Sequence, residues 1–383
     1  MGPLLRIAAC ALLFDALVPL APFLAAQTGR SNRAVQAAIA TGIAGFAVAQ
    51  LSAAPLLRRT GLRSGMLASS AFIVALGSIV ACLPRSTVTL PLLVAMFVAN
   101  APGSVAARAM LRTDLDHASY QRVIARLYAS LECIEIVLPF AIITAATILD
   151  WRVPFLVLCL ALLGSIAPAC LRREPCDSRL GAPPHCRRSI LLDKAFLGPA
   201  MLMMLIQSSF TAVALAKPAI LLETLRLTSF GLEATLSAFA LLMLAGFHVS
   251  SRLTRSVSDH ARIKLGMLLQ CGAALLLIVS TAVPSTLTFV SACALAALAY
   301  CVLFPVLNAL AMNMPESARV DASAWFGFLQ GAGSGPIVLV GSMVDLPALA
   351  RLASIVSICT LVALATANGL LRNTSDPSCT PAT

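Results

Sequence analysis

The chain has 383 residues, of which 59% are hydrophobic and only 11% are charged. Soluble domains carry about 25% charged residues, so this composition excludes an ordinary soluble protein and indicates an integral membrane protein. The formal net charge is +11, but the basic residues lie in short clusters between apolar segments. Such clusters are typical of membrane topology signals, and they argue against a nucleic-acid partner.

Twelve apolar segments follow one another along the chain, most of them about 20 residues or longer. Helices are the expected spanning form, because the segments are too long and too continuous for the strands of a membrane barrel. We expect transmembrane helices at 4–26, 34–57, 65–83, 88–111, 124–149, 153–171, 195–216, 228–250, 263–283, 286–312, 322–344 and 347–371.

Lysine and arginine are distributed unequally between the two sides of these segments. With the N-terminus inside, 20 of the 27 basic residues lie on the cytoplasmic side and 7 on the other side. The positive-inside rule therefore predicts that both termini are cytoplasmic, which requires an even number of helices.

The first segment contains the sequence LLFDALVPLAPF at 12–23, with Asp15 inside the apolar run and Pro19 and Pro22 after it. Asp15 is eleven residues into the segment, about 16 Å along a helix and close to the middle of the bilayer. The prolines are expected to bend the helix and to free backbone carbonyls beside this carboxylate. An aspartate at the centre of the run argues against a cleaved signal peptide.

Further charges lie inside later segments. Glu132 and Glu135 are about 12 and 16 Å into segment 124–149, and their spacing places them on one helix face. A carboxylate in a low-dielectric pocket has a raised pKa and can carry a proton, and a cationic substrate competes with that proton. This competition is sufficient for antiport, with Asp15 first, Glu135 second and Glu132 beside it. Arg108, at a depth matching Glu132, is predicted to form a structural ion pair with it.

The longest polar stretch, RREPCDSRLGAPPHCRRS at 172–189, divides the twelve segments six and six. Its prolines, glycine and charges are typical of a linker. The expected organisation is an N-terminal half at 1–171, a cytoplasmic linker at 172–194, a C-terminal half at 195–371 and a cytoplasmic tail at 372–383. Two six-helix halves around a central pathway are the major facilitator architecture, an all-α membrane fold.

The first 170 residues resemble the Bcr/CflA-type bacterial drug exporters. Such proteins have an aspartate and paired prolines in the first helix, and an arginine-rich loop after the second. Further resemblance lies in ARAMLRTD at 107–114 and DWRVPF at 150–155. The resemblance implies a proton-coupled exporter that acts as a monomer in the bacterial inner membrane. The matching positions are Asp15, Pro19, Pro22, Val35, Gln36, Gln50, Leu51, Arg59, Gly61 and Arg63.

Several positions depart from the family pattern. The loop aspartate that helps to latch the cytoplasmic side of such transporters is Arg58 here, although Arg59, Gly61 and Arg63 of the gating loop remain. The arginine of the fourth helix falls on Met96. Ala54 replaces the leading glycine of the loop, and Ile142 and Ile143 replace the glycines of the fifth helix. The chain is therefore interpreted as a divergent member.

Polar residues in the second half complete the set of candidates. Gln207, Asn308 and Gln330 are expected either to contact the substrate or to form interhelical hydrogen bonds. The glycines of FGFLQGAGSGP give their helix a small-residue face for close packing. They do not form a phosphate-binding loop, because the Lys-Ser/Thr pair of that motif is absent. The four histidines are isolated, so we expect no metal site, no cofactor and no enzyme activity.

Three functions stay open at this point. The first is proton-coupled export of a small, drug-like molecule by alternating access. The second is transport of a siderophore or another specific metabolite. It gains weight from an aromatic content of only 5%, because drug pockets stack flat cations on rings. The third is a membrane scaffold or sensor derived from a transporter, and Arg58 in place of the loop aspartate is its main support.

Overall fold

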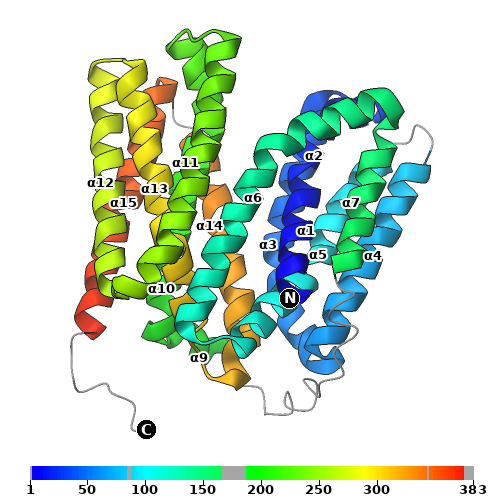
Figure 1. The fold of residues 1–383 in the computed structure, drawn as a ribbon, viewed down its shortest axis with the longest axis horizontal. Coiled ribbons are helices and arrows are strands. Elements are labelled where there is room, and N and C mark those ends of the chain that lie inside the picture. Colours follow the sequence, from blue (N-terminus) through cyan, green and yellow to red (C-terminus); the bar gives the residue numbers. More distant parts are fainter. Residues whose placement is uncertain (1, 84–87, 166–186, 343–344, 375–383) are drawn as a thin grey trace. The chain divides into compact units, whose positions relative to one another are not determined.

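The computed structural model is all-helical and describes residues 2–83, 88–165, 187–342 and 345–374 (Figure 1). Short π-helical turns η1 (Ala146–Asp150) and η2 (Ile220–Thr224) follow α6 and α10, and a 3-10 turn η3 (Glu316–Ala318) precedes α14. The helices are α1 (Gly2–Asp15), α2 (Leu17–Thr28), α3 (Asn32–Thr60), α4 (Leu62–Cys82), α5 (Thr89–Asp114), α6 (His117–Ala145), α7 (Arg152–Ser165), α9 (Arg187–Leu192), α10 (Lys194–Ala219), α11 (Ser229–Ser256), α12 (Asp259–Ala282), α13 (Thr286–Ala311), α14 (Arg319–Ser342) and α15 (Ala348–Thr374).

Each predicted transmembrane segment overlaps one of these helices or a bent pair of them. Within the described ranges, eight helices are long and apolar enough to cross a membrane, and ten spans result if two bent pairs each count once. The all-helical membrane fold is therefore confirmed, whereas the number of twelve spans stays a prediction. Segment 153–171 corresponds to α7, and its residues from 166 onward lie outside the described part.

The first segment is bent beside Asp15, as its prolines predict. α1 ends at Asp15 and α2 begins at Leu17, and the axes of Gly2–Asp15 and Leu20–Thr28 differ in direction by 59°. Proline removes a backbone donor and its ring clashes with the preceding turn, which accounts for the break. α6 and η1 form the second bent pair, with 44° between His117–Leu138 and Ala141–Asp150 around Pro139.

The chain divides into two compact units. Unit 1 comprises Met1–Asp116, Cys133–Arg187 and Met314–Gly331, and unit 2 comprises His117–Glu132, Arg188–Asn313 and Ala332–Thr383. Unit 1 thus includes the start of α14, and unit 2 includes the start of α6. The predicted halves at 1–171 and 195–371 stay a prediction. Residues 172–186 of the predicted linker and 375–383 of the predicted tail lie outside the described ranges.

Within unit 1, α5 packs against α3, α4 and α1, and α1 also packs against α7. Glycines allow this close approach: a side chain at Gly45 of α3 would meet Val98 of α5 at 3.0 Å. Within unit 2, α13 packs against α10, α11 and α12, while α15 packs against α10 and α12. A side chain at Gly246 of α11 would likewise meet Cys301 of α13 at 3.0 Å.

Candidate functional site

The loop between α3 and α4 is bound to the start of α14 by an ion pair in unit 1. Arg58 lies in the last turn of α3, and its guanidinium contacts the carboxylate of Asp321 in the first turn of α14. Asp321 is only 1% exposed and Arg58 21% exposed. A base at the end of one helix and an acid at the start of another both complement the helix dipoles.

The buried negative charge of Asp321 is compensated by the positive charge of Arg58. Neither carboxylate oxygen of Asp321 accepts a hydrogen bond from another described residue. A buried carboxylate that loses its partner is destabilised by about 3–5 kcal/mol. Position 58 therefore keeps an electrostatic contact although it carries the opposite sign from the family's aspartate. The sequence did not single out Asp321, which is one of 16 acidic residues.

The neighbours of both residues in the chain, Leu57 and Val320, belong to one apolar cluster. It is built from residues of α3, α4, α5 and α14, including Ala54 at the position of the family's loop glycine. The hydroxyl of Ser323 donates to the Val105 carbonyl at 3.1 Å, and Arg319 donates to the Thr113 hydroxyl at 3.4 Å. The first turns of α14 are thus held to the end of α5 as well as to the loop.

Arg108 of α5 belongs to the same contact. Its guanidinium donates to the side-chain carbonyl of Gln50 on α3, which is buried, and to the backbone carbonyl of Ser323 at 3.4 Å. A side chain at Gly327 of α14 would collide with both Gln50 and Arg108. Arg108 lies in unit 1 and Glu132 in unit 2, so the ion pair predicted between them stays a prediction.

The rest of the gating loop shapes the turn between α3 and α4. Gly61 has a φ of 84°, a value that glycine adopts without steric cost, and it directly follows α3. Arg59 is exposed and Arg63 is half-buried. Of these loop residues, Arg58 is the one that forms an ion pair with the buried carboxylate of α14.

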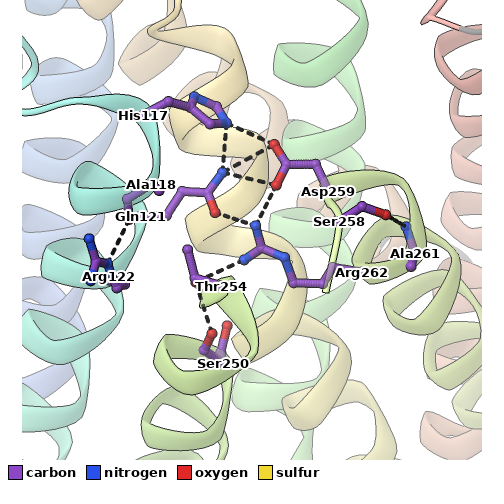
Figure 2. Close-up of polar contacts among 10 residues, drawn as sticks. All are labelled: His117, Ala118, Gln121, Arg122, Ser250, Thr254, Ser258, Asp259, Ala261 and Arg262. Carbon is purple, nitrogen blue, oxygen red and sulfur yellow. Dashed lines mark hydrogen bonds and ion pairs between the residues drawn. The ribbon is translucent and has the colours of Figure 1, made fainter. Parts of the chain in front are cut away.

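A second contact joins the start of α6 to the start of α12 in unit 2 (Figure 2). The Nε2 atom of His117 lies 2.7 Å from one carboxylate oxygen of Asp259. The amide nitrogen of Gln121 donates to both oxygens of that carboxylate at 3.2 Å. Arg262 donates to Asp259 and to Gln121, and at 3.0 Å to the hydroxyl of Thr254 on α11.

The two contacts occupy corresponding places in the chain order. In the first contact, the end of the second predicted segment (34–57) and its loop bind the start of the fifth segment of the C-terminal half (322–344). In the second contact, the loop after the second segment of the C-terminal half (228–250) binds the start of the fifth segment of the N-terminal half (124–149). Gln121 and Arg262 are fully buried or nearly so, which indicates a packed contact rather than a solvated surface pair. These residues lie outside the predicted segments 124–149 and 263–283, and no local pattern relates His117 to Asp259.

The predicted coupling carboxylates lie on two helices, Asp15 on α1 and both Glu132 and Glu135 on α6. Asp15 ends α1 in unit 1, where its side chain is exposed at the helix break. Glu132 is half-buried in α6 in unit 2, where it interacts electrostatically with Lys217 of α10. The ammonium of Lys217 also lies 3.9 Å from the centroid of the Phe239 ring, a cation–π contact. The side chain of Glu135 lies outside the described part.

Unit 2 gathers aromatic rings that are dispersed in the sequence. Tyr300 stacks on Phe210 with centroids 4.3 Å apart, and Tyr128 meets Phe304 edge to face at 4.5 Å. Phe247 joins the same cluster. Tyr300 and Phe304 are buried, whereas Tyr128 and Phe210 are half-buried and leave ring surface accessible.

Two of the polar candidates of the second half, Gln207 and Asn308, accept hydrogen bonds from other helices. The hydroxyl of Tyr300 donates to Gln207 at 3.0 Å, and that of Tyr120 donates to Asn308 at 2.8 Å. Asn308 is buried, whereas Gln207 is half-buried beside the aromatic cluster. Gln330 is half-buried in α14. Of these three, Gln207 is thus the one that lies beside accessible rings.

The sequence profile of the Major Facilitator Superfamily matches residues 5–337. This chain belongs to the Major Facilitator Superfamily. It is a multi-pass membrane transporter of small molecules, not an enzyme, since the superfamily consists of transporters. The described residues contain no cluster of histidine, cysteine and acidic side chains that would hold a metal ion. No curated protein sequence matches the chain.

Solved transporter structures share this major facilitator fold. A bacterial homologue of the iron transporter ferroportin in an outward-facing state has a TM-score of 0.77 at 13% identity, with 98% of each chain covered. The fucose:proton symporter of E. coli has a TM-score of 0.71 at 15% identity over 96% of each chain. The human organic anion transporter has a TM-score of 0.64 at 16% identity, over 96% of this chain and 97% of that one.

One further charge of this major facilitator chain was not expected inside the protein. Arg6 of α1 counts among the cytoplasmic basic residues in the topology prediction, but its side chain is fully buried in unit 1. It donates to Ser70 of α4 at 2.7 Å and to Asn100 of α5 at 2.8 Å. An arginine near a chain terminus is a common topology signal, and no local pattern indicates that this one turns inward.

Proposed function

We propose that the chain is a proton-coupled exporter of a small, drug-like molecule that works by alternating access in the bacterial inner membrane. In this proposal both termini are cytoplasmic and the functional unit is a single chain. The Arg58–Asp321 ion pair is the observation that carries it. The proposal therefore retains the relationship to Bcr/CflA-type exporters and interprets the altered loop as a modified latch rather than a lost one.

The ion pair supports gating because it joins two elements that alternating access must separate. Arg58 takes the place of the family's loop aspartate, and a carboxylate, Asp321, lies on the opposing helix α14. An ion pair between the end of α3 and α14 is thus present, with the positive charge on Arg58 and the negative charge on Asp321. A scaffold without transport has no need to retain such a buried pair, so this contact favours the transporter over the scaffold.

Coupling is assigned to Asp15, with Glu135 and Glu132 as further carboxylates. Asp15 ends α1 at the break between α1 and α2, and its side chain is exposed there. Such a site accepts either a proton or a cation at the carboxylate, and competition between them links substrate release to proton entry. Because the proton and the cationic substrate cannot occupy the carboxylate together, the proposed transporter is an antiporter.

The aromatic cluster of unit 2 favours a drug-like substrate over a siderophore. Tyr128 and Phe210 are half-buried members of this cluster, and Tyr300, which stacks on Phe210, donates to the amide oxygen of Gln207. A low overall aromatic content does not limit the site, because the rings that exist are gathered in one place. A flat cation stacks on such rings, whereas a siderophore or another polar metabolite requires a denser set of hydrogen-bonding groups.

The test is substrate-induced proton movement in vesicles that contain the purified protein. Addition of a planar organic cation should release or take up protons only in vesicles with the wild-type chain. Asp15→Asn should abolish this signal, because the amide cannot exchange a proton. Asp345→Asn, at an exposed position outside the helices, serves as the matched control and should retain it.

Other outcomes assign the alternative functions. Full proton coupling in Asp15→Asn would remove Asp15 from the mechanism. Proton movement with a siderophore but with no planar cation would favour the metabolite transporter. No substrate-induced proton movement with any compound, from a protein that is folded and membrane-inserted, would contradict transport and support a scaffold.

A further inference from the structure

A small apolar pocket, the α10–α15 pocket, lies between these two helices of unit 2. Its volume is about 230 Å³, and eight described residues line it. Seven of them are apolar, namely Leu215 and three alanines on α10 and Ala348, Leu352 and Ile355 on α15. The eighth is Arg351 of α15. The pocket therefore combines an apolar wall with a single basic residue.

The pocket lies at the ends of both helices on the same side. α10 has 26 residues and α15 has 27, which correspond to about 39 and 40 Å. A bilayer with its headgroups is about 40–45 Å thick, so the ends of these helices lie at headgroup level. Ala219 ends α10, Ala348 begins α15, and both line the pocket. Arg351 is one turn further into α15, beside the boundary between headgroups and hydrocarbon.

Small side chains create the space in this pocket. Ala212, Ala216 and Ala219 are spaced i, i+4 and i+7, so they follow one face of α10. Leu215, which also lines the pocket, is 65% exposed, so the pocket continues into an exposed apolar surface. Pockets for drug-sized molecules measure about 300–1,000 Å³, so this one is too small for a whole substrate of that size. It is large enough for an apolar segment such as part of an acyl chain.

Arg351 gives the pocket a preference for an anion. Its side chain is half-buried, and an arginine in such a place packs its apolar stem along the wall while its guanidinium stays near the polar boundary. The planar guanidinium matches the geometry of a phosphate group, to which it donates paired hydrogen bonds. None of the eight lining residues is acidic, so they offer no carboxylate to the ammonium group of a zwitterionic headgroup.

We propose that the α10–α15 pocket binds an anionic phospholipid, with part of one acyl chain in the pocket and the phosphate on the guanidinium of Arg351. The occupant that fits is a molecule with an apolar chain and a negative charge at headgroup level, and basic pockets between transmembrane helices bind lipid headgroups in this way. The inference goes beyond the proposed function, because lipid binding here requires neither a substrate nor a coupled proton.

The test is a competition between two lipids, followed by native mass spectrometry of the purified full chain in detergent. Phosphatidylglycerol and phosphatidylcholine with identical acyl chains are added in equal amounts, and the first lipid retained by the protein is identified by its mass. Arg351→Gln should lower the ratio of retained phosphatidylglycerol to phosphatidylcholine about fivefold, the effect of one basic residue near the membrane surface. Arg226→Gln removes an exposed arginine that does not line the pocket and should leave the ratio unchanged.

A second pair of variants tests the apolar wall and covers the case in which Arg351→Gln does not fold. Ala219→Phe places a ring at a lining position and should lower the retention of phosphatidylglycerol roughly tenfold, as expected if two methylene groups of the acyl chain lose their burial. Ala214→Phe adds the same ring at an exposed position of α10 that does not line the pocket, and it should retain the lipid as the wild type does.

Four results would overturn the inference. The first is an unchanged lipid ratio in Arg351→Gln, or an equal fall in Arg226→Gln. The second is equal lipid retention by Ala219→Phe and Ala214→Phe. The third is displacement of the lipid by inorganic phosphate, which would show that the acyl chain contributes nothing. The fourth is a dimer in the same spectra that Ala219→Phe converts to a monomer, because a second copy of the chain would then cover the pocket. None of these measurements needs a substrate, so failed proton coupling contradicts only the proposed function.

Discussion

Arg58 at the end of α3 and Asp321 in the first turn of α14 form an ion pair whose carboxylate is 1% exposed. Both residues also lie at helix ends where their charges are favourable. Because Asp321 is buried, the end of α3 and the start of α14 separate only when a buried charge loses its partner. In the proposed function, this is a contact that alternating access has to break and re-form.

Reversal of one charge in this pair should destabilise the protein. Asp321→Arg or Arg58→Asp places two like charges together in an apolar cluster, and a loss of about 3–5 kcal/mol is expected. Thermal unfolding of the purified protein in detergent measures it as a lower midpoint. Arg59→Asp changes the exposed neighbour and is the control. A midpoint for Asp321→Arg equal to that of Arg59→Asp would show that the pair contributes nothing.

Gln121 should contribute strongly to the stability of the contact between α6 and α12, although its side chain is neutral. Gln121 is fully buried and connects Asp259 to Arg262, so Gln121→Leu leaves donors and acceptors of a charged group unpaired. A loss of about 1–3 kcal/mol is expected, again measured as a lower unfolding midpoint. Gln36→Leu, at an exposed position of α3, should leave the midpoint unchanged. Equal behaviour of the two variants contradicts a packed contact.

Gly327 should not tolerate a β-branched side chain without loss of a contact beside it. A Cβ there would overlap the side-chain ends of Gln50 and Arg108, so Gly327→Val should move these ends apart and break the hydrogen bond between them. Transport should fall about 5-fold or more, since overpacking of a close helix contact costs about 1–3 kcal/mol. The matched control is Gly164→Val in α7, where no atom lies within 4 Å of the added Cβ. Wild-type transport by Gly327→Val would mean that α14 does not approach these residues in a working state.

The accessible rings of unit 2 should select substrates by shape. Tyr128→Ala and Phe210→Ala remove ring surface, and affinity for a planar aromatic cation should fall about 5- to 30-fold, as expected for loss of about 1–2 kcal/mol. A tetraalkylammonium ion, which cannot stack, should lose much less. Fluorescence titration of the purified protein measures both ligands. Equal losses for the two cations would indicate a general packing defect instead of a stacking site.

The parts of this account that were predictable from sequence are those that a local pattern carries. Helices follow from apolar runs, and the break beside Asp15 follows from Pro19 and Pro22, whose chemistry acts on the adjacent turn. Gly61 likewise marks the turn after α3 in both sequence and structure. Each of these signals is contained in a stretch of a few residues, so it can be recognised from the sequence without knowledge of the tertiary structure.

The partners of the candidate site were not predictable in this way. Asp321 is far from Arg58 in sequence, and nothing in its neighbours distinguishes it from a charge at a helix start. Arg6 has the position of a topology signal, and only the packing of α1 against α5 turns its side chain inward. Arg58 alone suggested a lost latch, because a single charge reveals its function only together with its partner.

The most direct test of the central claim is a charge exchange measured as substrate-induced proton movement in vesicles. Arg58→Asp and Asp321→Arg should each lose most of the signal. The double variant, which restores the aspartate of the family's loop and places its partner on α14, should recover a large part of it. Recovery in the double variant is the result predicted here. Full activity in either single variant, or a double variant no better than the singles, would contradict a latch formed by these two residues.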